Sequence, residues 1–287
     1  TIRHSAEADS GGSEVAFDPA IILPDWTSAE RKALLERPLF GFASYGRVRF
    51  HHRSVMEYLA AERILSLRSK GMSARALRRL IFVESRGETI VRHSKRAIAG
   101  WLALSESMIF ETLRDNEPDV LLNEGDPECL SPQQRLQTLR KYVERYGKCG
   151  WRGISVPNIQ IHRFSSSDLA DEINLLWSEG IENYEIREVL LQMIGHGQMS
   201  ECSDIAYNCS SDNNAEYGER RVALDSLVCL VDSRLPSLVG QLVQGSPDLT
   251  EKFIRIAVMR FFPKHMSVSN LLKIIPRLNH NIEQNRD

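Results

Sequence analysis

The sequence is poor in cysteine and has no long apolar run. Its 287 residues include five cysteines, which are scattered, odd in number and form no C-x-x-C pair. This usage argues against a disulfide framework and suits a reducing cytoplasm. No apolar segment approaches the roughly 18 residues of a membrane-spanning helix, and no signal peptide opens the chain. We therefore expect a soluble, cytoplasmic protein.

Motifs of the common catalytic classes are missing as well. The sequence contains no G-x-x-x-x-G-K-[ST] loop, and its only Gly-Lys pair, at 147–148, is not followed by Ser or Thr. H-E-x-x-H and G-x-S-x-G do not occur either. His196, Cys202 and Cys209 come nearest to a metal cluster, but their spacing differs from that of zinc sites. We expect no catalytic residue, metal or cofactor in this chain alone.

What is present is an ordinary globular composition with an uneven charge distribution. Hydrophobic residues make up 42% and charged residues 26%, which is enough apolar surface for two domains or one elongated array. The net charge of −2 hides a basic segment, residues 47–100, with 13 Lys or Arg against 4 Asp or Glu. Such a segment can mark an anion-facing module joined to an acidic partner domain.

The first 70 residues predict a polar tail followed by a small winged-helix module. Residues 1–25 are predicted to be a tail or linker, and residues 26–70 the module. Thr27 or Ser28 can cap a first helix that Pro38 stops.

Two short β-prone runs, "LFGFASY" and "RVRFHH", then predict a hairpin that turns at Gly46 and confines strand to residues 39–52. A helix from about Arg53 to Leu67 follows. Its apolar stripe, interrupted by one acid, consists of Val55, Tyr58, Leu59, Glu62 and Leu65. We expect Tyr58 in the core.

Residues 71–150 predict a helical linker region. Helical spacing covers "SARALRRLIF" and "ETIVRHSKRAIAGWLALSESMIFETLRD", and an acidic connector, "NEPDVLLNEGDPECLS", follows. Ser131, Pro132 and Gln134 form a capping box for a helix that ends at Tyr146. The segment "GKCGWRGISVPNIQIHRFSSS" is then the predicted domain boundary.

Residues 151–287 contain an internal repeat. Arg187, Arg221 and Arg255 each open an apolar helical segment, at intervals of 34 residues, and a second helical segment fills each gap. Paired helices at such a period indicate an α-solenoid of HEAT or TPR type, although 34 is shorter than the usual HEAT period and TPR signature residues are not evident. The predicted fold class is therefore mainly α.

The junction between the hairpin and the following helix carries a motif. The tract from Phe50 to Ala61 resembles the F-x-H-x-[ST]-F-x-E-[FY]-x-A-A signature of NACHT-type STAND NTPases, with Val55 where the family usually has phenylalanine. The matching residues are Phe50, His52, Ser54, Glu57, Tyr58, Ala60 and Ala61. The domain order is also similar, and the acidic connector with the helix after it resembles the segment before the repeats in bacterial antiviral STAND proteins of the Avs group.

This resemblance implies a role for His52. The matching histidine of the family contacts the β-phosphate of ADP and locks the closed state, a task that suits an imidazole donor. The resemblance also implies an upstream NACHT module that binds ATP or ADP with Mg, a protein trigger of phage origin on the repeats, and homo-oligomerisation in antiviral defence. Because residue 1 is threonine, we expect the chain to be part of a longer polypeptide. His51 is expected to face away from His52.

Other interpretations remain open. His52 may be replaced in this scheme by a purely structural residue that caps the hairpin and packs against Tyr58. The chain could be a stand-alone α-solenoid scaffold, or a DNA-binding regulator, although the helix that would read bases offers few donors. Basic side chains that could contact anions, phosphates or another domain are Arg75, Arg78, Arg79, Arg92, Lys95 and Arg96.

Overall fold

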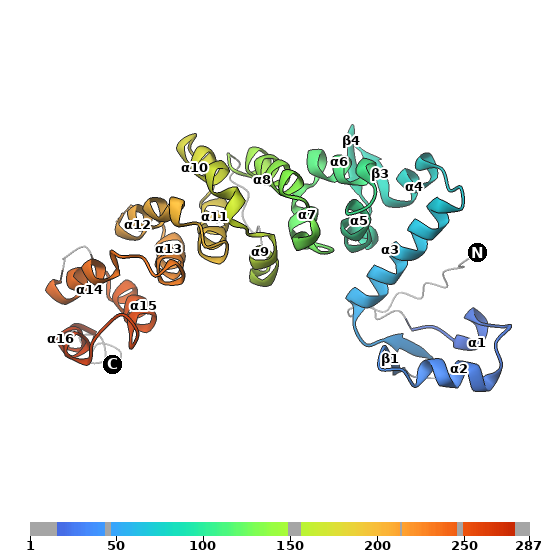
Figure 1. The fold of residues 1–287 in the computed structure, drawn as a ribbon, viewed down its shortest axis with the longest axis horizontal. Coiled ribbons are helices and arrows are strands. Elements are labelled where there is room, and N and C mark those ends of the chain that lie inside the picture. Colours follow the sequence, from blue (N-terminus) through green and yellow to red (C-terminus); the bar gives the residue numbers. More distant parts are fainter. Residues whose placement is uncertain (1–15, 44–46, 149–155, 213, 246–248, 279–287) are drawn as a thin grey trace, which may run out of the picture. The chain divides into compact units, whose positions relative to one another are not determined.

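The chain is mainly helical, as the sequence predicts (Figure 1). A computed structural model describes residues 16–43, 47–148, 156–212, 214–245 and 249–278. The chain divides into two units, residues 1–77 and 78–287, which are described separately. None of the helices in the described ranges combines the length and apolar character needed to cross a membrane.

The first unit has the predicted order of helix, hairpin and helix. Its elements are α1 (Pro19–Ile22), α2 (Ser28–Leu35), β1 (Phe40–Phe42), β2 (Val48–Phe50) and α3 (Arg53–Ser69). Thr27 caps α2 and exchanges hydrogen bonds with Glu30 in a capping box. Strands β1 and β2 pair antiparallel, with Phe40 opposite Phe50. The predicted turn at Gly46 lies outside the described residues.

Residues 17–25, which the sequence assigns to a tail or linker, take part in this unit. Phe17 exchanges two backbone hydrogen bonds of 2.9 Å with Val48, and its ring contacts the rings of Phe40 and Phe50. Helix α1 follows directly, capped by Asp18. An aromatic residue in a polar segment was the signal for this correction, because aromatic side chains are readily buried against a hairpin.

The predicted apolar stripe of α3 is largely uncovered. The buried residues of this helix are Ala61 and Ile64, whereas Tyr58 and Leu59 are 41% and 43% exposed. The expectation that Tyr58 belongs to the core is therefore wrong. A stripe is buried only where another element packs on it, and within this unit the hairpin strand β2 contacts the helix.

A second hairpin corrects the prediction that strand is confined to residues 39–52. Helix α4 (Ala74–Ile81) ends where β3 (Phe82–Ser85) begins, and β3 pairs antiparallel with β4 (Glu88–Val91). Both turn residues, Arg86 and Gly87, have positive φ angles, of 52° and 83°. Such a turn matches the twist of the strands, and the β-branched residues around it favour strand over the predicted helix.

The predicted acidic connector is folded rather than loose. The elements of this region are η2 (His93–Lys95), α5 (Arg96–Ala103), α6 (Ser107–Asn116), α7 (Pro118–Asn123), η3 (Pro127–Cys129) and α8 (Pro132–Tyr146). Within α7, Val120, Leu121 and Leu122 are buried, and the helix contacts α5, α6 and α8. The capping box of α8, with Ser131 and Gln134, is confirmed.

The remaining helices contain every segment of the predicted repeat. They are α9 (Asn158–Phe164), η4 (Ser167–Leu169), α10 (Ala170–Ser178), α11 (Tyr184–His196), η5 (Ser200–Cys202), α12 (Ser203–Ser211), α13 (Tyr217–Leu230), α14 (Leu235–Gln244), α15 (Glu251–Phe261) and α16 (Val268–Leu278). Part of the predicted break thus forms α9. The boundary predicted near residue 150 lies inside the second unit, beside residues that the structure does not describe.

Helices of the second unit contact one another in two rows. Helices α5, α7, α9, α11, α13 and α15 each contact the next in this order, and α6, α8 and α10 do the same. In Figure 1 the first row runs along the lower side of this unit. The three repeat arginines lie in the first turns of α11, α13 and α15.

Candidate functional site

His52 stands at the junction between hairpin and helix. It is the residue immediately before α3, its backbone is extended, and its side chain makes no capping hydrogen bond with the helix. The side chain is exposed. The structural alternative, in which His52 caps this junction, therefore receives no hydrogen bond in support, and the imidazole is accessible to a ligand.

His51 has a different environment. Its ring lies against β1, because a Cβ added to Gly41 would stand only 3.0 Å from the ring atom Cε1. The backbone N–H of His51 donates to the carbonyl of Leu39 at 2.9 Å. A glycine opposite the ring leaves room for this contact. The two adjacent histidines are thus distinguishable, and His51 serves as a matched control for His52.

Glu57 and Arg53 form a local pair on α3. The Arg53 Nε donates to a Glu57 carboxylate oxygen at 2.7 Å, one helical turn apart. Exposed pairs of this kind contribute only a few tenths of a kcal/mol, roughly 0.3–0.5. This contact stabilises the first turn of α3, which agrees with a structural role for Glu57.

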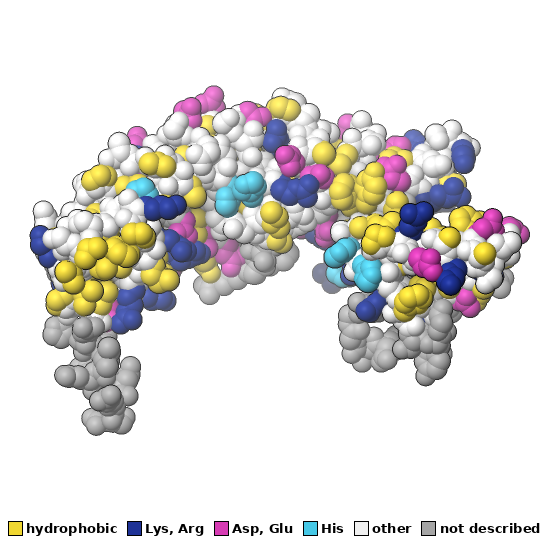
Figure 2. Space-filling model, turned by 60° about the horizontal axis from the view of Figure 1, so that its bottom comes forward, with side chains coloured by type: hydrophobic (Ala, Val, Ile, Leu, Met, Phe, Trp, Pro, Cys, Tyr) yellow, Lys and Arg dark blue, Asp and Glu magenta, His cyan; other side chains and the backbone are white. Residues whose placement is uncertain are grey.

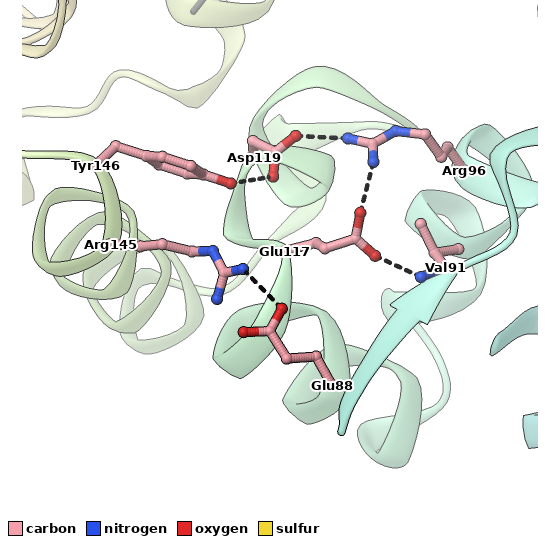
Figure 3. A network of polar contacts seen from close by, with 7 residues as sticks. All are labelled: Glu88, Val91, Arg96, Glu117, Asp119, Arg145 and Tyr146. Carbon is pink, nitrogen blue, oxygen red and sulfur yellow. Dashed lines mark hydrogen bonds and ion pairs between the residues drawn. The ribbon is translucent and has the colours of Figure 1, made fainter. Parts of the chain in front are cut away.

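Arg96, one of the six basic residues singled out in the sequence, belongs to an internal network (Figure 3). Its two terminal nitrogens pair with Glu117 at 2.7 Å and Asp119 at 2.5 Å. Glu117 also accepts a hydrogen bond from the Val91 backbone N–H, and Asp119 accepts one from the Tyr146 hydroxyl at 2.8 Å. Arg96 therefore joins β4, α5, α7 and α8.

The network also affects the titration of its members. Burial raises the pKa of Tyr146, and the nearby charge of Asp119 raises it further. Tyr146 is therefore a neutral donor at all ordinary pH values. The guanidinium of Arg96, saturated by two carboxylates, has little capacity left for an outside anion.

The other five basic residues are placed differently. Arg78 pairs with Glu84 at 3.4 Å and donates to Thr89 at 3.0 Å, while Arg92 donates to the Arg79 carbonyl at 3.4 Å. For the side chains of Arg75, Arg79 and Lys95, no ion-pair partner is found in the described part of the chain. The structure thus does not gather the six into one anion site.

A polar groove lies between helices of the first row. It has a volume of about 320 Å³ and is lined by Asn158, Gln192, Gly195, His196, Arg221, Val222, Asp225, Ser226 and Cys229. These residues come from α9, α11 and α13. Figure 2 shows this side of the second unit, on which His, Lys or Arg, and Asp or Glu side chains are spread.

Close helix packing forms the floor of this polar groove. A Cβ added to Gly195 would stand 3.0 Å from the Cα of Ser226, so α11 and α13 approach closely there. The Ser226 hydroxyl donates to the carbonyls of Leu191 at 2.5 Å and Val222 at 3.0 Å. Two small residues thus bring the helices together while their hydrogen-bonding capacity is satisfied.

The walls of the polar groove are charged and ring-bearing. His196 Nε2 donates to the Asn158 side-chain oxygen at 2.7 Å, and its ring contacts that of His162, with centroids 5.2 Å apart. Burial lowers the pKa of His196, and the neighbouring His162 lowers it further. On the opposite wall, Asp225 pairs with Arg221 and with Arg260 of α15.

This arrangement offers donors and acceptors but no activated nucleophile. Such a surface can bind the polar groups of another chain. Sequence reasoning considered His196 only as a metal ligand and missed the groove. The available signal was Arg221 and Asp225, spaced i and i+4 on a repeat helix, which places both on one face.

His196, Cys202 and Cys209 do not converge. The Cys202 thiol donates to the Ala170 carbonyl at 3.3 Å, and Cys209 is buried elsewhere, on α12. Burial raises the pKa of Cys202 to about 11 and that of Cys209 to about 12. Both thiols therefore stay protonated at neutral pH, whereas a metal ligand must be a thiolate.

Comparison with known proteins finds no family model that matches this chain, and no significant match among curated proteins or solved structures.

Proposed function

We propose that this chain is the non-catalytic portion of a NACHT-type STAND NTPase. In this proposal residues 26–70 are the winged helix that contacts the nucleotide phosphate of the NTPase module and gates activation. The later helices form an α-solenoid that senses a protein trigger, and activation proceeds through homo-oligomerisation in antiviral defence. ATP or ADP with Mg would be held by the NACHT module of the intact polypeptide.

The conformation of the signature tract is the observation that carries this proposal. Phe50 ends β2, His52 directly precedes α3, and Ala61 is buried on that helix. This is the order that the family signature requires of strand, histidine and helix. The exposed His52 can donate to a phosphate oxygen, and losing that contact on domain rotation would release the closed state.

The helix contacts of the second unit support the sensor part of the proposal. Two rows of helices that contact their neighbours in sequence order are typical of α-solenoids, which bind other proteins along one row. The polar groove lies on such a row. Apolar side chains are also exposed on α15 and α16, namely Met259, Val268 and Leu272, and Figure 2 shows hydrophobic side chains gathered at this end of the second unit.

Direct nucleic-acid binding is less well supported than protein binding. Arg96 and Arg78 are engaged by carboxylates, so fewer cations are available to phosphates than the sequence suggests. Sequencing the gene upstream of residue 1 separates the candidates. A P-loop there supports the STAND proposal, whereas its absence favours a stand-alone scaffold or a regulator.

The chain by itself is expected to bind ATP and ADP only weakly. The sequence lacks the phosphate-cradling loop that supplies most of the backbone donors to nucleotide phosphates. Isothermal titration with Mg-ATP and with ADP should detect no binding in the micromolar range. Micromolar or tighter binding would contradict the view that His52 is only an auxiliary contact.

In the full-length polypeptide, His52→Ala is expected to lower the trigger dose needed for activation. The change removes a contact from the closed state alone, and only such differential contacts shift a conformational equilibrium. A hydrogen bond to a charged group contributes roughly 1.5–3 kcal/mol. The closed population should therefore fall by about one to two orders of magnitude.

Trigger titration with an oligomerisation readout measures this effect, and His51→Ala is the matched control. The control should need nearly the wild-type dose, because its ring lies against Gly41. Thermal melting of both variants checks that folding is intact. If both need the same dose as the wild type, His52 only shapes the junction.

A further inference from the structure

Arg220, on α13, is a buried cation without a carboxylate partner. Its side chain is in a residue only 6% exposed, and no carboxylate lies within ion-pairing distance of it among the described residues. Its guanidinium carbon lies 4.0 Å from the centre of the Phe253 ring, and its Nε donates to the Ser210 carbonyl at 3.3 Å. Buried arginines are normally paired.

The partial compensation of this charge leaves donors unused. The ring of Phe253 faces the cation, which is favourable when both are desolvated. Burial nevertheless lowers the pKa of Arg220, although the guanidinium stays charged. Within the described ranges, an acceptor is found for Nε alone, so the two terminal nitrogens keep a fork of N–H groups whose geometry matches a carboxylate.

Arg220 borders an apolar pocket between α12, α13, α14 and α15. The pocket has a volume of about 270 Å³ and is lined by Ser210, Ser211, Arg220, Leu224, Leu238, Gln241, Leu242, Leu249, Phe253, Ala257 and Phe261. Leucine and phenylalanine side chains form most of this lining. An apolar pocket with one or two polar groups is the usual form of a small-ligand site.

We propose that this apolar pocket binds a carboxylate carried on a short apolar group. The carboxylate would accept hydrogen bonds from the free nitrogens of Arg220, and the apolar part would lie among Leu224, Leu238 and Phe261. At roughly 30 Å³ for each water-sized group, the volume holds about nine such groups. A fatty acid of medium chain length or the C-terminal leucine of a peptide has this chemistry.

The proposal is independent of the STAND assignment, because it uses only contacts between α12 and α15. It also explains why a cation persists in an apolar site. A buried charge is costly unless it is paired, and a ligand carboxylate would supply the missing pair. The neighbouring Arg221 offers a contrast, since it faces the polar groove and pairs with Asp225 at 3.3 Å.

Isothermal titration of the full chain with four probes tests the proposal. Octanoate and N-acetyl-leucine carry the carboxylate, while octan-1-ol and N-acetyl-leucinamide are their neutral counterparts. We expect an acid to bind and its neutral counterpart to bind about 10- to 100-fold more weakly. Which of the two acids binds more tightly identifies the source of the ligand.

Two variants locate the site. Arg220→Met should lose the preference for the acid, whereas Arg221→Met on the same helix should keep it. Leu238→Trp, which fills the pocket with Arg220 intact, should abolish binding and serves if Arg220→Met does not fold. The proposal is overturned if neither acid binds, if octan-1-ol binds as tightly as octanoate, or if Leu238→Trp binds like the wild type.

Discussion

Replacing Arg187 with alanine is expected to lower the free energy of unfolding of the second unit by about 3–5 kcal/mol. Arg187 on α11 makes a two-point contact with Glu219 on α13, through Nε and through the second terminal nitrogen at 3.1 Å. Its other terminal nitrogen donates to the carbonyls of Ile181 and Glu182. Glu219 is only 1% exposed, so the variant would leave an unpaired buried carboxylate.

Urea unfolding followed by circular dichroism measures this loss, and the repeat supplies its control. Arg221 occupies the equivalent position 34 residues later and forms a half-exposed pair with Asp225, which keeps Arg260 as a partner. Arg221→Ala should therefore cost less than about 1 kcal/mol. Equal losses for the two variants would contradict the assignment of Arg187 as the buried contact.

A double variant checks the physical reason. Arg187→Met combined with Glu219→Leu removes both charges and keeps apolar volume at the site. Because replacing a whole buried pair is far less harmful than breaking it, the double variant should recover most of the stability that Arg187→Ala loses. If it is as unstable as the single variant, packing rather than charge explains the effect.

Replacing Arg96 with alanine should have the next largest effect, a loss of about 3 kcal/mol. The change removes the only cation that joins Glu117 and Asp119 in the network of Figure 3. Two partly buried carboxylates would then face each other without a counter-charge. Thermal melting and urea unfolding should show the loss, and native hydrogen exchange should place it at β4, α7 and α8.

Arg145→Ala is the matched control in the same network. Arg145 pairs with Glu88 at 3.5 Å, but their side chains are 37% and 61% exposed. Solvent screens such a pair, so the variant should lose less than about 1 kcal/mol. A larger loss from Arg145→Ala than from Arg96→Ala would refute the view that burial decides which contact matters here.

Local signals in the sequence were sufficient for most helices. The caps at Thr27 and Ser131 depend on side chains three residues apart, which interact as soon as a helix turn forms. The spacing of Arg187, Arg221 and Arg255 likewise located α11, α13 and α15, because a repeated apolar pattern marks the same helix in each copy. The hairpin β1–β2 and the start of α3 were predictable for the same local reasons.

Other segments were mispredicted because two local structures compete there. The residues of β3 and β4 have an apolar spacing that fits a short helix, and only the left-handed turn at Arg86 and Gly87 with its cross-strand pairing makes them strands. Helix α7 has an acidic sequence typical of a linker, yet its three central apolar residues are buried by α5, α6 and α8. Burial by distant segments leaves no local trace.

By itself, the sequence determined the helical character of this chain, its repeat period and the position of His52 before a helix, since each depends on residues within a few turns of one another. Only the tertiary structure decided which charges are paired. Arg96, Arg187 and Arg220 look alike in the sequence, but the first two meet carboxylates 21 to 32 residues away, and Arg220 meets an aromatic ring and an apolar pocket. The physical reason is that the free energy of a charge depends on its desolvation and on its partners, and both are set by helices far apart in the chain.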